Sequence, residues 1–487
     1  MVINWNIISK ILGSLLFIEA FFMSWCLVMA FVFEEDDVLA FLMSTLLTFG
    51  SAFVFLYFGR KAENALSRRD AYVVVTLVWV VFSFFGMFPF LIHGSVDSFT
   101  DAYFETMSGF TTTGATVIDN VEALPHGILF WRSLMQWIGG LGIVFFTIAV
   151  LPSLVGGSVK VFAAEATGPM RSKMHPRLST SAKWIWSIYV LLTLACGLSF
   201  WAAGMEWFDA TNYAMTTTAT GGFSTHNGST VFFNSNTIEY LAILFQFLAG
   251  INFTLLYMSI FKLKVGAVVR NTEFKLYLTT ILIATALIMY LLITRLHYNY
   301  EPAFRSALFQ VVSFITTTGL SNDDAGFWPH LTWVILMALM FMGACAGSTT
   351  GGFKCVRISM LIKVLRNEFR HILHPNAVLP VKLGDQSVPQ GKLVSLLAFF
   401  TLYAVMLLFT TAVMVVAGQI DIINSLTISL SLISNVGAGL DTNIGPQMSW
   451  ADLSIEMKWA CSVLMLVGRL EIMTVLVLFT RSFWREN

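Results

Sequence analysis

The stretch Asp101-Ala-Tyr-Phe-Glu-Thr-Met-Ser-Gly-Phe-Thr111-Thr-Thr-Gly114-Ala-Thr116 joins a short amphipathic segment to a run of threonine and glycine. It lies between two long apolar runs, near 72–93 and 128–151. A helix that crosses a bilayer needs about 20 mostly apolar residues, so this segment is too short to cross. Irregular backbone at membrane depth is tolerated only where protein buries it or where it lines a watery cavity. The stretch therefore predicts a re-entrant loop, which enters the membrane and returns to the same side.

Three later segments repeat this pattern, each between two apolar runs. They are Phe208–Ser224, Ala303–Ser321 and Ile423–Gly439. Aligned on one glycine each, the four loops place their candidate ion-contacting residues at Thr112, Thr113 and Gly114; Thr220, Gly221 and Gly222; Thr317, Thr318 and Gly319; and Asn435, Val436 and Gly437. A single loop of this composition is weak evidence, because small residues also let membrane helices pack closely. Four loops in the same place favour a shared function.

The composition places the chain in the membrane. Hydrophobic residues make up 57% of the 487 and charged residues 11%, against about 25% charged in soluble domains. Mean hydropathy is +0.76. The net charge is zero, which predicts no nucleic-acid partner. The five cysteines lie in or beside apolar runs without metal-ligand spacing, so we expect small buried hydrophobic residues rather than disulfides or a zinc site.

Loop charges orient the spans. Basic loops such as 60–69 and 354–382 alternate with acidic loops such as 34–37 and 206–209. The positive-inside rule then predicts that the basic loops and both termini are cytoplasmic. This alternation works only if the four short segments return to the outer side. Ten spanning helices result, one of them interrupted by Gly343-Ala-Cys-Ala-Gly347-Ser-Thr-Thr-Gly351-Gly352.

We therefore predict an all-α integral membrane protein with four membrane–pore-loop–membrane repeats and an N-terminal two-helix hairpin. The hairpin covers 1–60. The repeats cover 72–151, 183–264, 274–364 with the interrupted inner helix, and 391–482.

Four glycine-containing strands around one axis can point backbone carbonyls inward and replace the hydration shell of a potassium ion. Glycine suits such strands because it adopts dihedral angles that other residues avoid and adds no side chain to the lumen. The preceding short helices would direct their partially negative C-termini toward a cation. Potassium is thus the expected transported ion, and the chain is predicted to be no enzyme.

Two further features predict a gate. Arg469 lies in the middle of the last span, where a charge costs about 2.5–3.5 kcal/mol, so a functional role is the default. The alternative is that it pairs with Glu471 or extends to the interface. The glycine-rich interruption, with Gly343, Gly347, Gly351, Gly352 and the following Lys354, can absorb hinge dihedrals. Close helix packing is the alternative there, and the spacing does not fit a phosphate-binding loop.

Several motifs resemble one known superfamily. They are Thr111-Thr-Thr-Gly-Ala-Thr116, Gly221-Gly-Phe-Ser-Thr-His226, Gly343–Gly352, His374-Pro-Asn-Ala-Val378 and Gly468-Arg-Leu-Glu471. They are similar to the membrane subunits of the Trk, Ktr and plant high-affinity potassium transporters, over nearly the whole chain. The resemblance implies a pseudo-fourfold pore, a homodimer in the bacterial cytoplasmic membrane, and a cytosolic TrkA-like nucleotide-binding regulatory subunit. It also places Arg469 as a barrier below the filter.

Two other classes of membrane protein would show different sequence patterns. A secondary transporter of another fold would show two inverted halves, and a membrane enzyme would show intramembrane clusters of His, Asp or Cys. We expect the loops 157–183 and 363–390 to dock the cytosolic partner. Glu105 is expected to be a structural acid, and Trp131-Arg132 an interfacial anchor.

Overall fold

The computed structural model describes residues 3–62, 66–142, 178–377, 379–384, 386–418, 420–440 and 449–485. The end of the first predicted repeat, 143–151, and most of the first predicted docking loop, 157–177, lie outside these residues. The long and short α-helices are α1 Trp5–Phe33, α2 Val38–Phe58, α3 Arg68–Gly86, α4 Phe88–His93, α5 Phe99–Phe110, α6 His126–Gly140, α9 Leu178–Ala202, α10 Trp207–Ala219, α11 Asn236–Ala249, α12 Phe253–Ile260, α13 Val265–Arg270, α14 Thr272–Leu296, α15 Tyr300–Ile315, α16 His330–Met342, α17 Cys355–Leu373, α18 Gln390–Gly418, α19 Ile422–Ile433, α20 Ile455–Arg469, α21 Ile472–Leu476 and α22 Arg481–Trp484. The 3-10 turns are Gly59–Lys61, Val121–Ala123, Ser229–Phe233, Ala325–Phe327 and Val477–Phe479.

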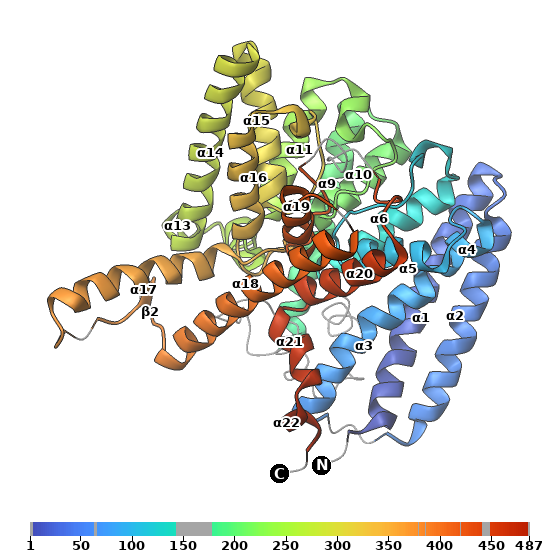
Figure 1. The fold of residues 1–487 in the computed structure, drawn as a ribbon. Coiled ribbons are helices and arrows are strands. Elements are labelled where there is room, and N and C mark those ends of the chain that lie inside the picture. Colours follow the sequence, from blue (N-terminus) through green and yellow to red (C-terminus); the bar gives the residue numbers. More distant parts are fainter. Residues whose placement is uncertain are drawn as a thin grey trace.

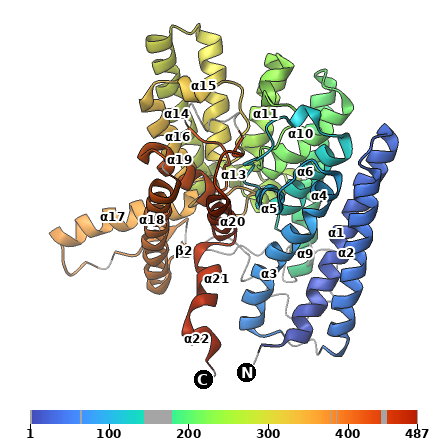
Figure 2. The same ribbon diagram turned by 45° about the vertical axis from the view of Figure 1, so that its right-hand side comes forward.

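The N-terminal hairpin packs on the first helices of the body. Helices α1 and α2 lie side by side and next to α3 (Figure 1). Asn4 caps α1 by accepting the amide of Ile7, and its own amide donates to Asp70 at 3.0 Å. Helix α1 begins, and the C-terminal α22 ends, on the same side of the molecule in two views (Figures 1 and 2). The pairing of α1 with α2 agrees in outline with the predicted hairpin, whose bounds 1–60 stay a prediction.

An outer helix, a short buried helix and an inner helix follow one another four times along the chain. The outer helices are α3, α9, α14 and α18, and the inner ones begin with α6, α11, α16 and α20. The short helices α5, α10, α15 and α19 have 12, 13, 16 and 12 residues, too few to cross a bilayer. They are mostly buried, whereas the outer helices α9, α14 and α18 expose many apolar side chains. The outer helix α3 is itself mostly buried. The order agrees in outline with the predicted repeats, whose boundaries stay a prediction.

The inner helices depart from the prediction. Helices α11 and α12 meet at a bend of 104°, and α20 and the helix after it meet at 112°. The prediction of one interrupted helix among ten spans is therefore wrong, because the continuous runs near 237–262 and 455–480 are broken as well. Over the described residues, six helices are long and apolar enough to cross a membrane, or up to eight if each bent pair is one span.

A polar residue occupies the N-cap position of the second helix at each of these breaks. Asn252 caps α12 by accepting the Thr254 amide at 2.8 Å, and Glu471 precedes α21 with a φ of 61°. Mean apolarity is high on both sides of each break, so a search for apolar runs joins the two halves.

The third inner helix begins with α16, which ends at Met342. The loop 343–354 and then α17 follow it. Helix α17 extends away from the rest of the molecule, beside α18 (Figures 1 and 2). A two-stranded antiparallel sheet, β1 Lys382–Leu383 with β2 Gln386–Ser387, follows it and is the small exception to the predicted all-α fold.

Candidate functional site

The four short helices end in the same way. At each C-terminus one amide bonds three residues back and the next amide bonds five residues back, which is the Schellman pattern. The first pair joins Thr112 to Gly109 and Thr113 to Ser108. The equivalent pairs are Thr220–Thr217 with Gly221–Thr216, Thr317–Phe314 with Thr318–Ser313, and Asn435–Leu432 with Val436–Ser431. The four segments therefore share one backbone conformation, although their sequences differ.

The residue that ends each helix is in the left-handed region. Thr112, Thr220, Thr317 and Asn435 have φ between 53° and 55°. Glycine usually occupies this position, and a β-branched residue there is an outlier. Sparsely populated backbone conformations cost about 1–3 kcal/mol each and cluster at functional sites. Three of these positions hold threonine, and the fourth holds Asn435, a residue type that adopts the left-handed region more readily.

The aligned glycines close a ring. Gly114, Gly222, Gly319 and Gly437 have φ between 78° and 84°. A Cβ added to each one would lie far inside van der Waals distance of a carbonyl oxygen in the next loop. The facing carbonyls belong, in order, to Gly221, Thr318, Val436 and Thr113, so the fourth loop returns to the first. Only glycine fits these positions, and one chain forms the complete ring.

Side chains behind the strands hold two of the loops. Glu105 and Arg132 form an ion pair at 2.9 Å, with side chains 0% and 2% exposed. Arg132 also donates to the Ser224 carbonyl at 3.0 Å, which joins the first two loops. Gln136 donates to the Gly221 carbonyl at 2.8 Å, a bond specific to the second loop. The expectation of an interfacial anchor at Trp131-Arg132 is wrong, because both side chains are buried and Arg132 has a buried carboxylate partner.

The loop 343–354 lies directly against the ends of the short helices. The Gly351 amide donates to Thr317 Oγ1 at 2.7 Å, and the Gly352 amide donates to the Ser434 carbonyl at 3.0 Å. Thr349 Oγ1 donates to the Thr218 carbonyl at 3.1 Å. The loop thus contacts three of the four re-entrant segments.

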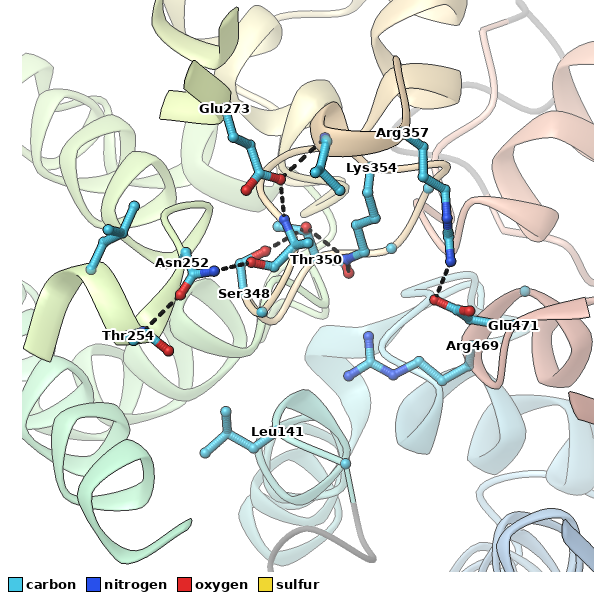
Figure 3. A pocket seen from close by; sticks show the side chains of 18 of the residues that line it. Leu141, Asn252, Thr254, Glu273, Ser348, Thr350, Lys354, Arg357, Arg469 and Glu471 are labelled. Carbon is cyan, nitrogen blue, oxygen red and sulfur yellow. Dashed lines mark hydrogen bonds and ion pairs between the residues drawn. The ribbon is translucent and has the colours of Figure 1, made fainter. Parts of the chain in front are cut away.

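Two cations hold this loop. Arg469 donates to the Thr349 carbonyl at 2.9 Å and to the carbonyls of Gly139 and Gly140, both at 2.7 Å. Lys354 has a φ of 81° and its Nζ donates to the carbonyl of Thr350 (Figure 3). The structure thus places the Lys354 side chain on the loop itself.

Cavities lie on both sides of the ring. One of about 60 Å³ is lined by all four ring glycines, together with Thr116, Arg132 and Ser224 among others. A second, of about 450 Å³, is lined by Gly347, Gly351, Gly352, Lys354 and Arg469 among others. Gly343 is the one predicted gate residue that does not line it; its φ of 64° starts the loop. The strands and the loop 343–354 therefore lie between a small cavity and a large one.

Sequence reasoning did not single out three residues that hold this site. Asn252 donates to the Ala346 carbonyl at 2.6 Å, and Glu273 accepts the Ala346 amide at 2.6 Å. Arg357 pairs with Glu471 at 2.6 Å (Figure 3). Asn252 falls inside an apolar run predicted to be one continuous helix, which concealed it. Glu471 was expected as a partner of Arg469, and its ion-pair partner in the structure is Arg357. A polar residue inside a long apolar run was the available signal.

Long apolar helices around four short buried ones indicate an integral membrane protein. The TrkH family model, described as a cation transport protein, matches residues 42–486. The chain is 35% identical to the Trk system potassium uptake protein TrkH of Salmonella typhimurium, over 99% of this chain and 100% of that protein. It is 37% identical to the protein of the same name from Halomonas elongata, over 99% of each.

A solved structure has the same fold. The crystal structure of the potassium transporter TrkH from Vibrio parahaemolyticus superposes with a TM-score of 0.89 at 33% identity, covering 99% of this chain and 100% of that one. The chain belongs to the TrkH family, a family of membrane transporters and not of enzymes. This confirms the family resemblance found in the sequence.

Proposed function

We propose that this chain takes up potassium across the bacterial cytoplasmic membrane through a pore whose filter is the ring of Gly114, Gly222, Gly319 and Gly437. The closed ring of glycines and facing carbonyls is the observation that carries the proposal. Close relatives are named potassium uptake proteins. Carbonyl oxygens arranged around one axis can replace the hydration shell of an ion, which would enter from the small cavity.

The loop 343–354 acts as the gate in this proposal. It contacts three short helices or their ends, and Arg469 joins it to α6. A cation leaving the filter would meet this loop and the Arg469 guanidinium before reaching the large cavity. Both the obstruction and the positive charge would slow passage until the loop moves.

A cytosolic TrkA-like nucleotide-binding subunit would move the loop, and the chain would act as a homodimer in lipid with both termini in the cytoplasm. Helix α17 follows the loop directly and projects from the body with basic and apolar side chains exposed. It offers a lever between such a subunit and the gate. Nucleotide would act only through that partner.

The substitution Gly319→Ala tests the filter. The added Cβ would meet the Val436 carbonyl, and we expect potassium flux to fall by about tenfold or more, as overpacking costs about 1–3 kcal/mol. Gly94→Ala is the matched control, because Gly94 has a φ of 79° against 78° for Gly319 but nothing within 4 Å of the added Cβ. The measurement is rubidium flux into proteoliposomes, with growth rescue of potassium-uptake-deficient cells alongside. Equal flux in the two variants would remove the ring as the filter.

A further inference from the structure

The two ends of the loop 343–354 meet at a single carboxylate oxygen. Glu273 Oε1 accepts the amide of Ala346 at 2.6 Å and the amide of Val356 at 3.2 Å. Ala346 lies near the start of the loop, and Val356 lies in the first turn of α17, just after the loop. Figure 3 shows the Glu273 side chain reaching these amides from α14.

This oxygen supplies what each end of the loop lacks. The first amides of a helix have no partner within it, and the N-cap position of α17 is Lys354, whose side chain makes no capping bond. A carboxylate at a helix N-terminus satisfies such an amide and interacts favourably with the helix dipole. Glu273 therefore caps α17 from another helix.

The other end is held from both sides. The Ala346 amide donates to Glu273, while its carbonyl accepts from Asn252 at 2.6 Å. The Cys345 amide donates to the Gly250 carbonyl at 3.1 Å. Hydrogen bonds to a charged acceptor are about twice as strong as neutral ones, so an ionised Glu273 strengthens the hold on Ala346.

The orientation of Glu273 is itself fixed. Asn271 caps α14 and accepts the amides of Glu273 at 2.9 Å and Phe274 at 3.1 Å. This cap sets where the first turn of α14 begins. It therefore also sets the direction of the Glu273 carboxylate, which lies in that turn. Glu273 also lines the large cavity.

We propose that Glu273 is a positioning residue that keeps the loop in the pore by holding its two ends together. This inference rests on the proposed gating role of the loop 343–354. A displacement of α17 would draw the Val356 amide away from Glu273. Because the Ala346 amide shares the same carboxylate oxygen, Ala346 would then either lose this hydrogen bond or move together with Glu273. The carboxylate thus couples the movement of α17 to the part of the loop below the ring.

A native thiol reports on the loop directly. Cys345 lies beside Ala346 and is 0% exposed, so reagents reach it only when the loop moves. In a background where Cys26, Cys196, Cys355 and Cys461 are replaced by alanine, the labelling rate of Cys345 by a water-soluble methanethiosulfonate measures loop opening. Flux of rubidium, without any regulatory subunit, is measured on the same proteoliposomes.

We expect Glu273→Ala to raise both the labelling rate and the flux by about tenfold, with a smaller rise for Glu273→Gln, since a hydrogen bond to a charged group is worth about one such factor. Glu273→Asp should restore part of the wild-type behaviour, and selectivity for rubidium over sodium should stay unchanged. Glu456→Gln is the matched control, because Glu456 also lies in the first turn of a helix but is exposed.

Each outcome has a separate meaning. Unchanged Cys345 labelling in correctly assembled Glu273→Ala protein would overturn the positioning role. Faster labelling with unchanged flux would support the positioning role and would instead overturn the loop as the gate. Lost selectivity would show that Glu273 acts on the ring, which also contradicts the inference.

Discussion

At the scale of single residues, charge near the ring is held by backbone carbonyls. Arg469 contacts three carbonyls, one on the loop 343–354 and two at the end of α6. A guanidinium can hold several acceptors at once in a fixed geometry, whereas an ammonium is a compact point charge. Arg469 therefore combines two effects, a positive potential below the ring and a tie between the loop and α6.

Substitutions at Arg469 separate these effects. We expect Arg469→Ala to raise rubidium flux by about three- to tenfold, because both the charge and the hydrogen bonds to the loop are lost. Arg469→Lys keeps the charge but cannot reproduce all three bonds, and we expect an intermediate flux. Proteoliposome flux at equal protein incorporation measures both. If Arg469→Lys equals wild type, the charge alone is the barrier; if Arg469→Ala shows no increase, Arg469 is no part of the gate.

At the scale of elements, the breaks in the inner helices are joined to the loop 343–354 by polar side chains. The break between α11 and α12 supplies Asn252, whose side chain caps α12 and donates to the Ala346 carbonyl. The break after α20 supplies Glu471, which pairs with Arg357 of α17. Each break therefore supplies a polar side chain that contacts the loop 343–354 or the helix α17 that follows it.

Asn252→Asp tests whether the first break holds the loop. The carboxylate can still cap α12, but it places an acceptor against the Ala346 carbonyl in place of a donor. We expect α12 to persist and Cys345 labelling to rise by about tenfold, since a buried unpaired acceptor costs about 1–3 kcal/mol. Asn252→Ser, which keeps a capping group without reaching the carbonyl, is the control and should rise less. Labelling equal to wild type in Asn252→Asp would exclude this contact as a restraint.

Sequence reasoning found the four segments that form the short helices, because length and composition are local signals. Their re-entrance stays a prediction. The alignment of the four loops on Gly222 agrees with the structure. Gly222 has a φ of 80°, and the other three aligned glycines also have a positive φ. The helix breaks at Asn252 and Glu471 were missed, since hydropathy is high on both sides of them. The contacts of Glu273 and Arg132 join segments that are far apart in the sequence. A single sequence carries no signal that shows which distant positions touch.

At the scale of the whole molecule, the four re-entrant segments belong to one chain. Each ring glycine faces a carbonyl of the next segment, and the last faces the first. The ring is therefore complete within a single protomer, and a homodimer of this protein would contain two pores. Symmetric channels that build one filter from several subunits behave differently, because one defective subunit affects the shared filter.

Mixing experiments distinguish these two arrangements. Wild-type chains and Gly319→Ala chains, carrying different tags, are co-expressed, and the mixed dimers are purified by both tags and reconstituted. Because each protomer completes its own ring, we expect rubidium flux to fall in direct proportion to the wild-type fraction, and mixed dimers to keep the flux of their intact protomer. Gly94→Ala chains serve as the control for tagging and incorporation, since Gly94 has open space around the added Cβ. A fall much steeper than linear, with inactive mixed dimers, would mean that the two protomers share one conduction path or gate only together.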